Sequence, residues 1–359
     1  MQPHFAVSRM LFDSFCHFYT KEYLDQLRNS CPAITLVGPE PNSDRIYIVD
    51  SRLDRRVDIG FLRSGSGFDN IDRRLKDMEH FGIDMQALSI ATPGIDTELL
   101  HVSPKETVRL AKVINDSLAS IAKKHPDKFV AIAEVPILQI DEALEEFDRA
   151  INTLGMRGVQ VYTTVGGLPL DSPQFRPFFE RAAKLDIPVL IHPTYPPSTQ
   201  RRSYEMDYEL QMIYVWPFET TLSISRLVFS GIFEEFPNLK IVTHHSGAMV
   251  PFFGERIRSV YKQGRKGGLK EQSKMKKDPL EYFKLMYHDT SIYGSVAALN
   301  CTAAVMGPER MIYSTDYPYG PEDGLYFLRA TKESVEKMNV TEEERERICG
   351  GNAIKIFKL

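Results

Sequence analysis

The stretch GVQVYTTVGGLPLDSPQFRPFFERAAKLDIPVLIHP, residues 158–193, decides the fold because it contains one complete strand–helix–strand unit. Its two ends, 158–163 and 187–193, are short runs rich in valine and isoleucine, which predict buried strands. Residues 175–186 between them predict the connecting helix. Two continuous apolar strands joined by a helix indicate a parallel sheet that is covered by helices.

The same alternation continues along much of the chain. Further strands are expected at 10–14, 85–91, 129–136, 239–245, 284–290 and 311–315. Further helices are expected at 104–125, 139–155 and 225–237. The strand count is therefore about eight, the number in a (β/α)8 barrel. We predict an α/β fold in which residues 1–359 form one TIM-barrel domain.

Two segments interrupt this rhythm. Residues 28–70 are rich in Pro, Gly, Ser, Asp and Arg, and only IYIVD (46–50) predicts a strand, so we expect a small inserted region that caps the barrel mouth. Residues 194–215 form a long loop and helix directly after His192, where they would shape a substrate pocket. The basic run 261–277 predicts a solvated surface loop.

Composition excludes several classes of function. The net charge of −4 and pI near 6.2 argue against nucleic acid or an anionic membrane as a partner. No run of 18 apolar residues predicts a membrane span, and the first dozen residues lack the pattern of a secretory signal. The four cysteines (Cys16, Cys31, Cys301 and Cys349) have no paired spacing, which favours reduced thiols and a cytoplasmic protein.

Polar side chains occur where the predicted strands end. Catalytic groups of a TIM barrel lie at the carboxyl ends of its strands, so these side chains should meet at one mouth. They are His17, His192, His244, His245, Asp289 and Asp316. Two imidazoles and a carboxylate suit a divalent cation such as zinc, and a further histidine could move protons at neutral pH.

The first strand carries an anomaly within MLFDSFCHFYTKEYLDQL, residues 10–27. Asp13, Phe15 and His17 are two residues apart, so on a regular strand all three side chains point the same way. Phenylalanine has no lone pair and cannot bind a metal. Cys16 is adjacent, but strand alternation directs it away from the pocket.

Three segments carry a resemblance to a known family: 158–193 above, PFETTLSISRLVFSGIFEEFPNLKIVTHHSGAMVPFFGERI (217–257) and MIYSTDYPYG (311–320). They are similar to the amidohydrolase superfamily branch (amidohydrolase 2) that includes aminocarboxymuconate-semialdehyde decarboxylase and the resorcylate-type decarboxylases. The resemblance runs from the first strand to the terminal helix and is weakest over 28–70 and 194–215. It implies a distorted (β/α)8 barrel with one divalent metal, usually zinc and sometimes manganese.

The family's metal ligands fall on Phe15, His17, His192 and Asp316. Because Phe15 cannot bind a cation, His17, His192 and Asp316 remain as the expected ligands. Catalytic zinc sites commonly use three protein ligands, and this set also resembles that of non-haem iron enzymes. A site without metal in its resting state is the alternative.

The resemblance also implies roles for residues around the metal. The family's non-ligand catalytic histidine matches His245 when counted back from Pro251, or His244 if the register slips by one. Asp316 and Asp289 are further candidates for proton transfer. Expected substrate contacts are Phe15, Arg63 (with Arg56 as the alternative) and Arg256. In the loop 194–215, where the resemblance is weakest, Tyr204 is a further expected contact, although Tyr204, Arg201, Arg202 and Tyr208 could meet an anionic or aromatic acid or face solvent. Arg256 corresponds to an arginine that reaches a neighbouring subunit, which favours a homodimer.

Three functions fit these residues. The first is a metal-dependent carboxy-lyase acting on a small unsaturated or aromatic carboxylic acid. The second is a hydrolase or hydratase that uses metal-activated water at the same site. The third is a metal-free, non-catalytic homologue, which only Phe15 favours; retaining three histidines and an aspartate at strand ends argues against it.

Overall fold

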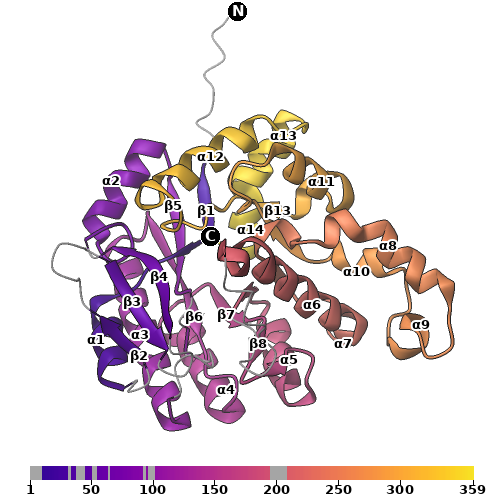
Figure 1. The fold of residues 1–359 in the computed structure, drawn as a ribbon, viewed down its shortest axis with the longest axis horizontal. Helices are drawn as coiled ribbons and strands as arrows, with labels where there is room; N and C mark the ends of the chain where they lie inside the picture. Colours follow the sequence, from indigo (N-terminus) through magenta and orange to yellow (C-terminus); the bar gives the residue numbers. More distant parts are fainter. Residues whose placement is uncertain are drawn as a thin grey trace, which may run out of the picture.

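The computed structural model describes residues 10–30, 34–37, 45–50, 55–63, 65–91, 94–95, 102–194 and 208–359. Eight parallel strands form its central sheet and follow one another around it in chain order (Figure 1). They are β1 (Phe12–His17), β5 (Met85–Ser89), β6 (Phe129–Glu134), β7 (Gly158–Tyr162), β10 (Val189–His192), β11 (Ile241–Thr243), β12 (Tyr287–Asp289) and β13 (Met311–Ile312). The predicted (β/α)8 barrel is confirmed.

The barrel closes between the segment after β13 and the first strand. The Ser14 amide donates to the Tyr313 carbonyl at 2.9 Å, and the His17 amide donates to the Tyr317 carbonyl at 2.8 Å. The Ser314 hydroxyl adds a bond to the Phe15 carbonyl at 2.6 Å. These bonds bring the residues that follow the last strand beside the end of β1.

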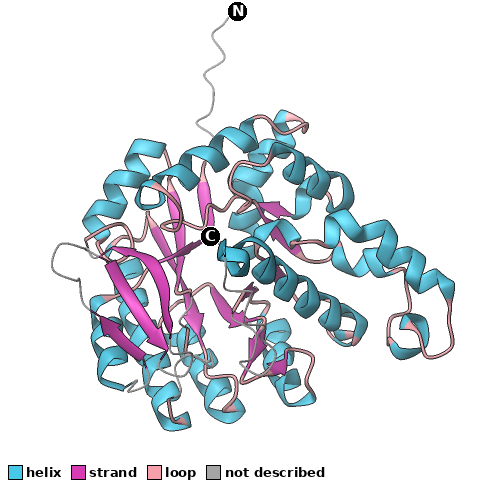
Figure 2. Ribbon diagram, in the orientation of Figure 1, coloured by secondary structure: helices cyan, strands magenta, loops and turns pink. Residues whose placement is uncertain are grey.

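Helices surround the sheet, and Figure 2 shows them in cyan outside the magenta strands. They are α1 (Lys21–Ser30), α2 (Ile71–Phe81), α3 (Pro104–Lys124), α4 (Ile140–Asp148), α5 (Arg176–Leu185), α6 (Trp216–Phe229), α7 (Ile232–Glu235), α8 (Val250–Gln263), α9 (Leu269–Gln272), α10 (Pro279–Phe283), α11 (Val296–Met306), α12 (Leu325–Glu336), α13 (Glu342–Glu346) and α14 (Asn352–Phe357). Within the part of the chain that is described, none of them is long and apolar enough to cross a membrane.

The helix predicted over 225–237 is wrong in its bounds. The structure has a longer helix, α6, that ends at Phe229, and a separate short helix, α7, that begins at Ile232. The break lies at Gly231, whose φ of 81° is in the left-handed region that favours glycine. A Cβ atom at this position would also lie 2.7 Å from the Cβ of Lys274, so the close approach of that chain requires glycine as well.

The inserted region holds more structure than the single strand predicted at 46–50. Three antiparallel strands form a small sheet: β2 (Ile34–Val37), β3 (Arg45–Asp50) and β4 (Arg55–Arg63). This sheet lies beside α1, with which β2 is in contact (Figure 1). A second small pair, β8 (Thr164–Val165) with β9 (Leu168–Pro169), follows β7. That the insertion caps the barrel mouth stays a prediction.

The barrel interior is an apolar cluster separate from the packing between sheet and helices. It joins side chains of seven central strands to the C-terminal helix α14: Phe12, Phe15, Ala87, Val130, Ile132, Leu190, Val242, Tyr287, Ile312, Ala353, Ile356 and Phe357. The rings of Phe12 and Phe357 lie 5.7 Å apart. Phe15 is fully buried in this cluster, on the side where β1 ends.

A bulge in β1 changes which side chains face the interior. The register with β5 shifts between Asp13 and Cys16, so two residues of β1 oppose one of its neighbour. Phe12 and Phe15 consequently share the interior cluster, and His17 faces the mouth. Asp13 instead bonds Thr315 and Gln86. The expectation that Asp13 points the same way as His17 is therefore wrong.

Candidate metal centre

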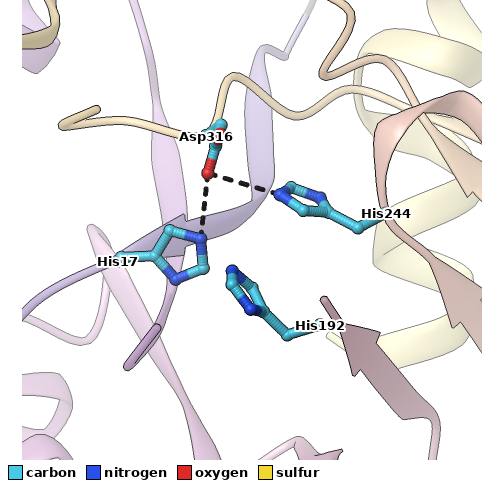
Figure 3. Close-up of side chains that lie close together, drawn as sticks. All are labelled: His17, His192, His244 and Asp316. Atoms are coloured by element: carbon cyan, nitrogen blue, oxygen red, sulfur yellow. Dashed lines mark hydrogen bonds and ion pairs between the residues drawn. The ribbon is translucent and has the colours of Figure 1, made fainter. Parts of the chain in front are cut away.

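Four buried side chains from four strand ends converge at the barrel mouth. His17 ends β1, His192 ends β10, His244 directly follows β11 and Asp316 follows β13. One nitrogen or oxygen of each lies within 4.8 Å of the corresponding atoms of the other three. Figure 3 shows their inner atoms facing one another. All four side chains are almost fully inaccessible to solvent.

Each of the three imidazoles is held by its outer nitrogen. Nδ1 of His17 lies 3.1 Å from the Ser89 hydroxyl, and Nδ1 of His192 lies 2.6 Å from the Pro193 carbonyl oxygen. Nδ1 of His244 bonds the Asp289 carboxylate. The three Nε2 atoms are therefore left for the shared space, which is the arrangement of metal-binding histidines whose other ring nitrogen is fixed by a second group.

The carboxylate of Asp316 completes the cluster. Its Oδ1 lies 3.1 Å from Nε2 of His17 and 3.3 Å from Nε2 of His244, shown as dashed lines in Figure 3. Its Oδ2 accepts a hydrogen bond of 2.7 Å from the Tyr293 hydroxyl. Burial alone would raise the pKa of Asp316, but the charge of His244 and the bonds from both histidines hold that pKa well below its usual range.

The positive charge of this cluster lies on His244. Burial would lower its pKa, but the carboxylates of Asp289 and Asp316 outweigh burial and raise the pKa to about 10. Burial lowers the pKa of His17. Burial, together with the histidines beside His192, lowers the pKa of His192 well below its usual value. The hydrogen on Nε2 of the protonated His244 ring faces Oδ1 of Asp316, and it occupies the place that a cation would take when that nitrogen binds it.

The structure thus brings together the three expected ligands and adds His244. The sequence named His244 only as the alternative to His245 for proton transfer. The feature of the sequence that could have identified His244 as a fourth donor is its position immediately after the strand, one residue nearer to the barrel than His245. Phe15 lies beneath the cluster, its ring 4.4 Å from that of His244 and 5.6 Å from that of His17, and it contributes no donor atom.

His245 lies next to the cluster and outside it. Its Nε2 is 3.0 Å from the Tyr293 hydroxyl oxygen and 4.0 Å from Oδ2 of Asp316. Its Nδ1 is buried and has no hydrogen-bond partner among the residues that the structure describes. Burial, together with the charge of His244, lowers the pKa of His245 to about 3, so its ring is neutral at physiological pH.

Asp289 lies behind His244. Its Oδ1 accepts the backbone amides of Ser246 at 2.8 Å and Ser291 at 3.2 Å, while Oδ2 bonds Nδ1 of His244. Both oxygens are therefore engaged in fixing the turn after β11 and the ring of His244. The expected role of Asp289 in proton transfer stays a prediction, and its contacts favour orientation of His244.

Two of the expected substrate contacts lie at the surface of the protein. Arg256 is exposed on α8, and Tyr208 is also exposed. Tyr204, Arg201 and Arg202 lie outside the described residues, as do the side chains of Arg56 and Arg63.

Sequence reasoning missed Ser89 and Tyr293, which touch the cluster, and Tyr319, whose ring lies 5.5 Å from that of His17. Each of them ends or follows a strand on the mouth side, and this position in the sequence could have identified them as candidates.

Comparison with known proteins gives matches over most of the chain. The family described as Amidohydrolase matches residues 61–359. A gamma-resorcylate decarboxylase of a Rhizobium species is 31% identical over 301 residues, which is 80% of this chain and 87% of that protein. The 2-amino-3-carboxymuconate-6-semialdehyde decarboxylase of Dictyostelium discoideum is 28% identical over 288 residues, 80% of this chain and 76% of that protein.

A solved structure shows the same architecture. It is a dihydroxybenzoic acid decarboxylase from a Polaromonas species with bound manganese and the inhibitor 2-nitroresorcinol. It superimposes with a TM-score of 0.77 at 26% identity and covers 98% of this chain and 97% of its own. The matched fold therefore spans the whole barrel, including β1.

Proposed function

The chain belongs to the amidohydrolase family, and from this premise we propose that it is a metal-dependent, non-oxidative decarboxylase of an aromatic or unsaturated carboxylic acid. The observation that carries the proposal is the convergence of three imidazoles and one carboxylate at the mouth of the barrel. Relatives over most of the chain, and a manganese-bound structural neighbour, are decarboxylases of such acids. Together they support a carboxy-lyase more directly than a hydrolase or hydratase.

The residues present fit a divalent cation. His17, His192 and Asp316 would hold it, with His244 as a fourth donor in place of the histidine that Phe15 replaces. Three nitrogen donors and one carboxylate oxygen suit zinc, and manganese is the alternative that the Polaromonas structure offers. When bound, the cation supplies a positive charge that holds the substrate's oxygens and withdraws electrons from the carbon that loses its carboxylate.

His245 is proposed to move the proton that decarboxylation requires. Breaking the carbon–carboxylate bond releases carbon dioxide, and the carbon must gain one proton in exchange. Nδ1 of His245, which has no hydrogen-bond partner among the described residues, can take a proton from a substrate hydroxyl and deliver it to that carbon.

The experiment is a decarboxylation screen over hydroxybenzoates and muconate-type acids, using protein loaded with zinc or with manganese. Carboxyl-labelled substrate should release labelled carbon dioxide, and the product should have lost one carboxyl group. A ring-opened or hydrated product would favour the hydrolase or hydratase instead. Metal content near zero, without turnover after metal is restored, would favour the non-catalytic homologue.

A homodimer is the proposed assembly. The outer faces of α6 and α8 carry large exposed apolar side chains, among them Phe218, Leu222, Phe252 and Phe253. Phe252 is 79% exposed, and Arg256 is exposed on the same helix. An exposed apolar patch beside a charged residue is typical of a protein–protein interface. Light scattering should give the mass of two chains, and Phe252→Glu should give the mass of one.

A further inference from the structure

We infer that Tyr293 is a positioning residue of this centre: its hydroxyl selects which oxygen Asp316 presents to the cluster and which nitrogen of His245 carries a proton. The inference deepens the proposed function, on which its kinetic test rests. The first of its two tests requires no substrate.

One hydroxyl group joins the metal-binding carboxylate to the neighbouring histidine. The Tyr293 oxygen is 2.7 Å from Oδ2 of Asp316 and 3.0 Å from Nε2 of His245. A hydroxyl has a single proton to donate, and an ionised carboxylate can only accept. The proton therefore points to Asp316, and the hydroxyl oxygen must accept the bond from His245.

This direction fixes the tautomer of His245. Its Nε2 carries the hydrogen that Tyr293 accepts, so in the neutral ring Nδ1 has a bare lone pair. That nitrogen is buried and has no partner among the described residues, which leaves it available to a group that donates a proton. In the proposed reaction this group is the hydroxyl of the substrate.

The same hydroxyl fixes the orientation of Asp316. With Oδ2 occupied by Tyr293, only Oδ1 points to Nε2 of His17 and His244. A carboxylate anchored at one oxygen offers a single donor atom to a cation. Loss of the anchor would let the group rotate and would change its distance to both imidazoles.

The backbone supports a positioning role for these three residues. Tyr293, His245 and Asp316 have φ values of 53°, 55° and 63°, in the left-handed region that non-glycine residues rarely adopt. Such conformations persist where surrounding structure enforces them, and they cluster at functional sites. The ring of Tyr293 is held by stacking on Phe327 of α12, with centroids 3.9 Å apart and planes 12° apart.

Tyr293→Phe tests the role of the hydroxyl separately from the role of the ring. The variant keeps the surface that stacks on Phe327 and loses both hydrogen bonds. If Tyr293 only packs against Phe327, the variant should match the unmodified protein in every measurement.

The first test is nitrogen NMR of histidine-labelled, zinc-loaded protein, since zinc is diamagnetic. The signals of His245, identified by their loss in His245→Gln, should show a protonated Nε2 and a bare Nδ1. Tyr293→Phe should give a mixture of tautomers. A protonated Nδ1 in the unmodified protein, or an unchanged pattern in Tyr293→Phe, would overturn the inference.

The second test is kinetic. Tyr293→Phe should lower kcat by about 10- to 100-fold, as loss of a group that orients a metal-site residue does, with KM little changed and zinc retained at saturating metal. Tyr282→Phe is the matched control, because it also removes a tyrosine–carboxylate bond, to Glu234, at the opposite end of β12. Equal kcat in Tyr293→Phe overturns the inference. If no acid is decarboxylated, the proposed function fails and the NMR result alone decides.

Discussion

Asp13→Asn tests how the fold tolerates a buried carboxyl group behind the metal centre. Asp13 is fully buried and accepts the backbone amide of Thr315 at 3.0 Å, the Thr315 hydroxyl at 2.6 Å and the amide of Gln86 at 3.2 Å. Gln86 in turn accepts a bond from Arg74, a guanidinium with no solvent exposure. Burial nevertheless outweighs these groups and raises the pKa of Asp13 to about 7.

The magnitude follows from that pKa. Because the folded state binds the proton more tightly than the unfolded state, the free energy of unfolding falls as pH rises from about 4 to about 7 and is then constant. The difference between the ordinary pKa of 3.8 and about 7, at roughly 1.4 kcal/mol for each pH unit, corresponds to about 4 kcal/mol. The asparagine in Asp13→Asn cannot ionise, so the free energy of unfolding of this variant should not fall in this way.

The assay is urea unfolding from pH 4 to pH 8 on metal-free protein, because metal binding is itself pH-dependent. The unmodified protein should lose stability relative to Asp13→Asn by about 4 kcal/mol across this range. Thr315→Val removes a bond that lowers the pKa of Asp13, so its loss of stability should extend to higher pH. Parallel curves for the unmodified protein and Asp13→Asn would refute the reasoning, and would mean that Arg74 and the hydrogen bonds keep Asp13 ionised.

Three substitutions test the cluster and the residues beside it. His245→Ala should lower kcat by about 100- to 10,000-fold with unchanged zinc content by elemental analysis, as loss of a proton-transfer group does; loss of zinc would instead make His245 a ligand. His244→Ala should weaken zinc binding in chelator competition by more than the roughly 10- to 100-fold cost of changing a group behind a ligand, and unchanged affinity would remove His244 from the donor set. Phe15→His should tighten zinc binding while lowering the melting temperature of the metal-free protein, since an imidazole replaces a packed ring in the barrel interior; no gain in affinity would mean that the remodelled pocket has no room for a further donor.

The barrel and most of its candidate centre could be predicted from the sequence because both depend on local patterns. Apolar strands alternate with helices, and a polar residue ends or closely follows four of the strands, β1, β10, β11 and β13, at the mouth. This pattern was enough to place His17, His192 and Asp316 together. The helix that breaks at Gly231 could not be predicted in its bounds, because the break depends on the close approach of Lys274, which is distant in the chain.

The roles of His244 and His245 could not be separated from the sequence. Both follow the same strand, and the chain changes direction between them: His244 is extended, whereas His245 and Ser246 are left-handed. One residue of register therefore decides which ring enters the cluster. The bulge in β1 has the same effect on Asp13, since one additional residue reverses the side to which a strand directs its side chains.

The contact between Phe12 and Phe357 has a consequence for biosynthesis. Phe12 of the first strand packs in the barrel interior against α14, so this contact cannot form until residues 352–357 have left the ribosome. Such distant pairing delays the closing step of folding and leaves the early strands exposed meanwhile. We therefore expect nascent barrels to need protection from association with one another during translation.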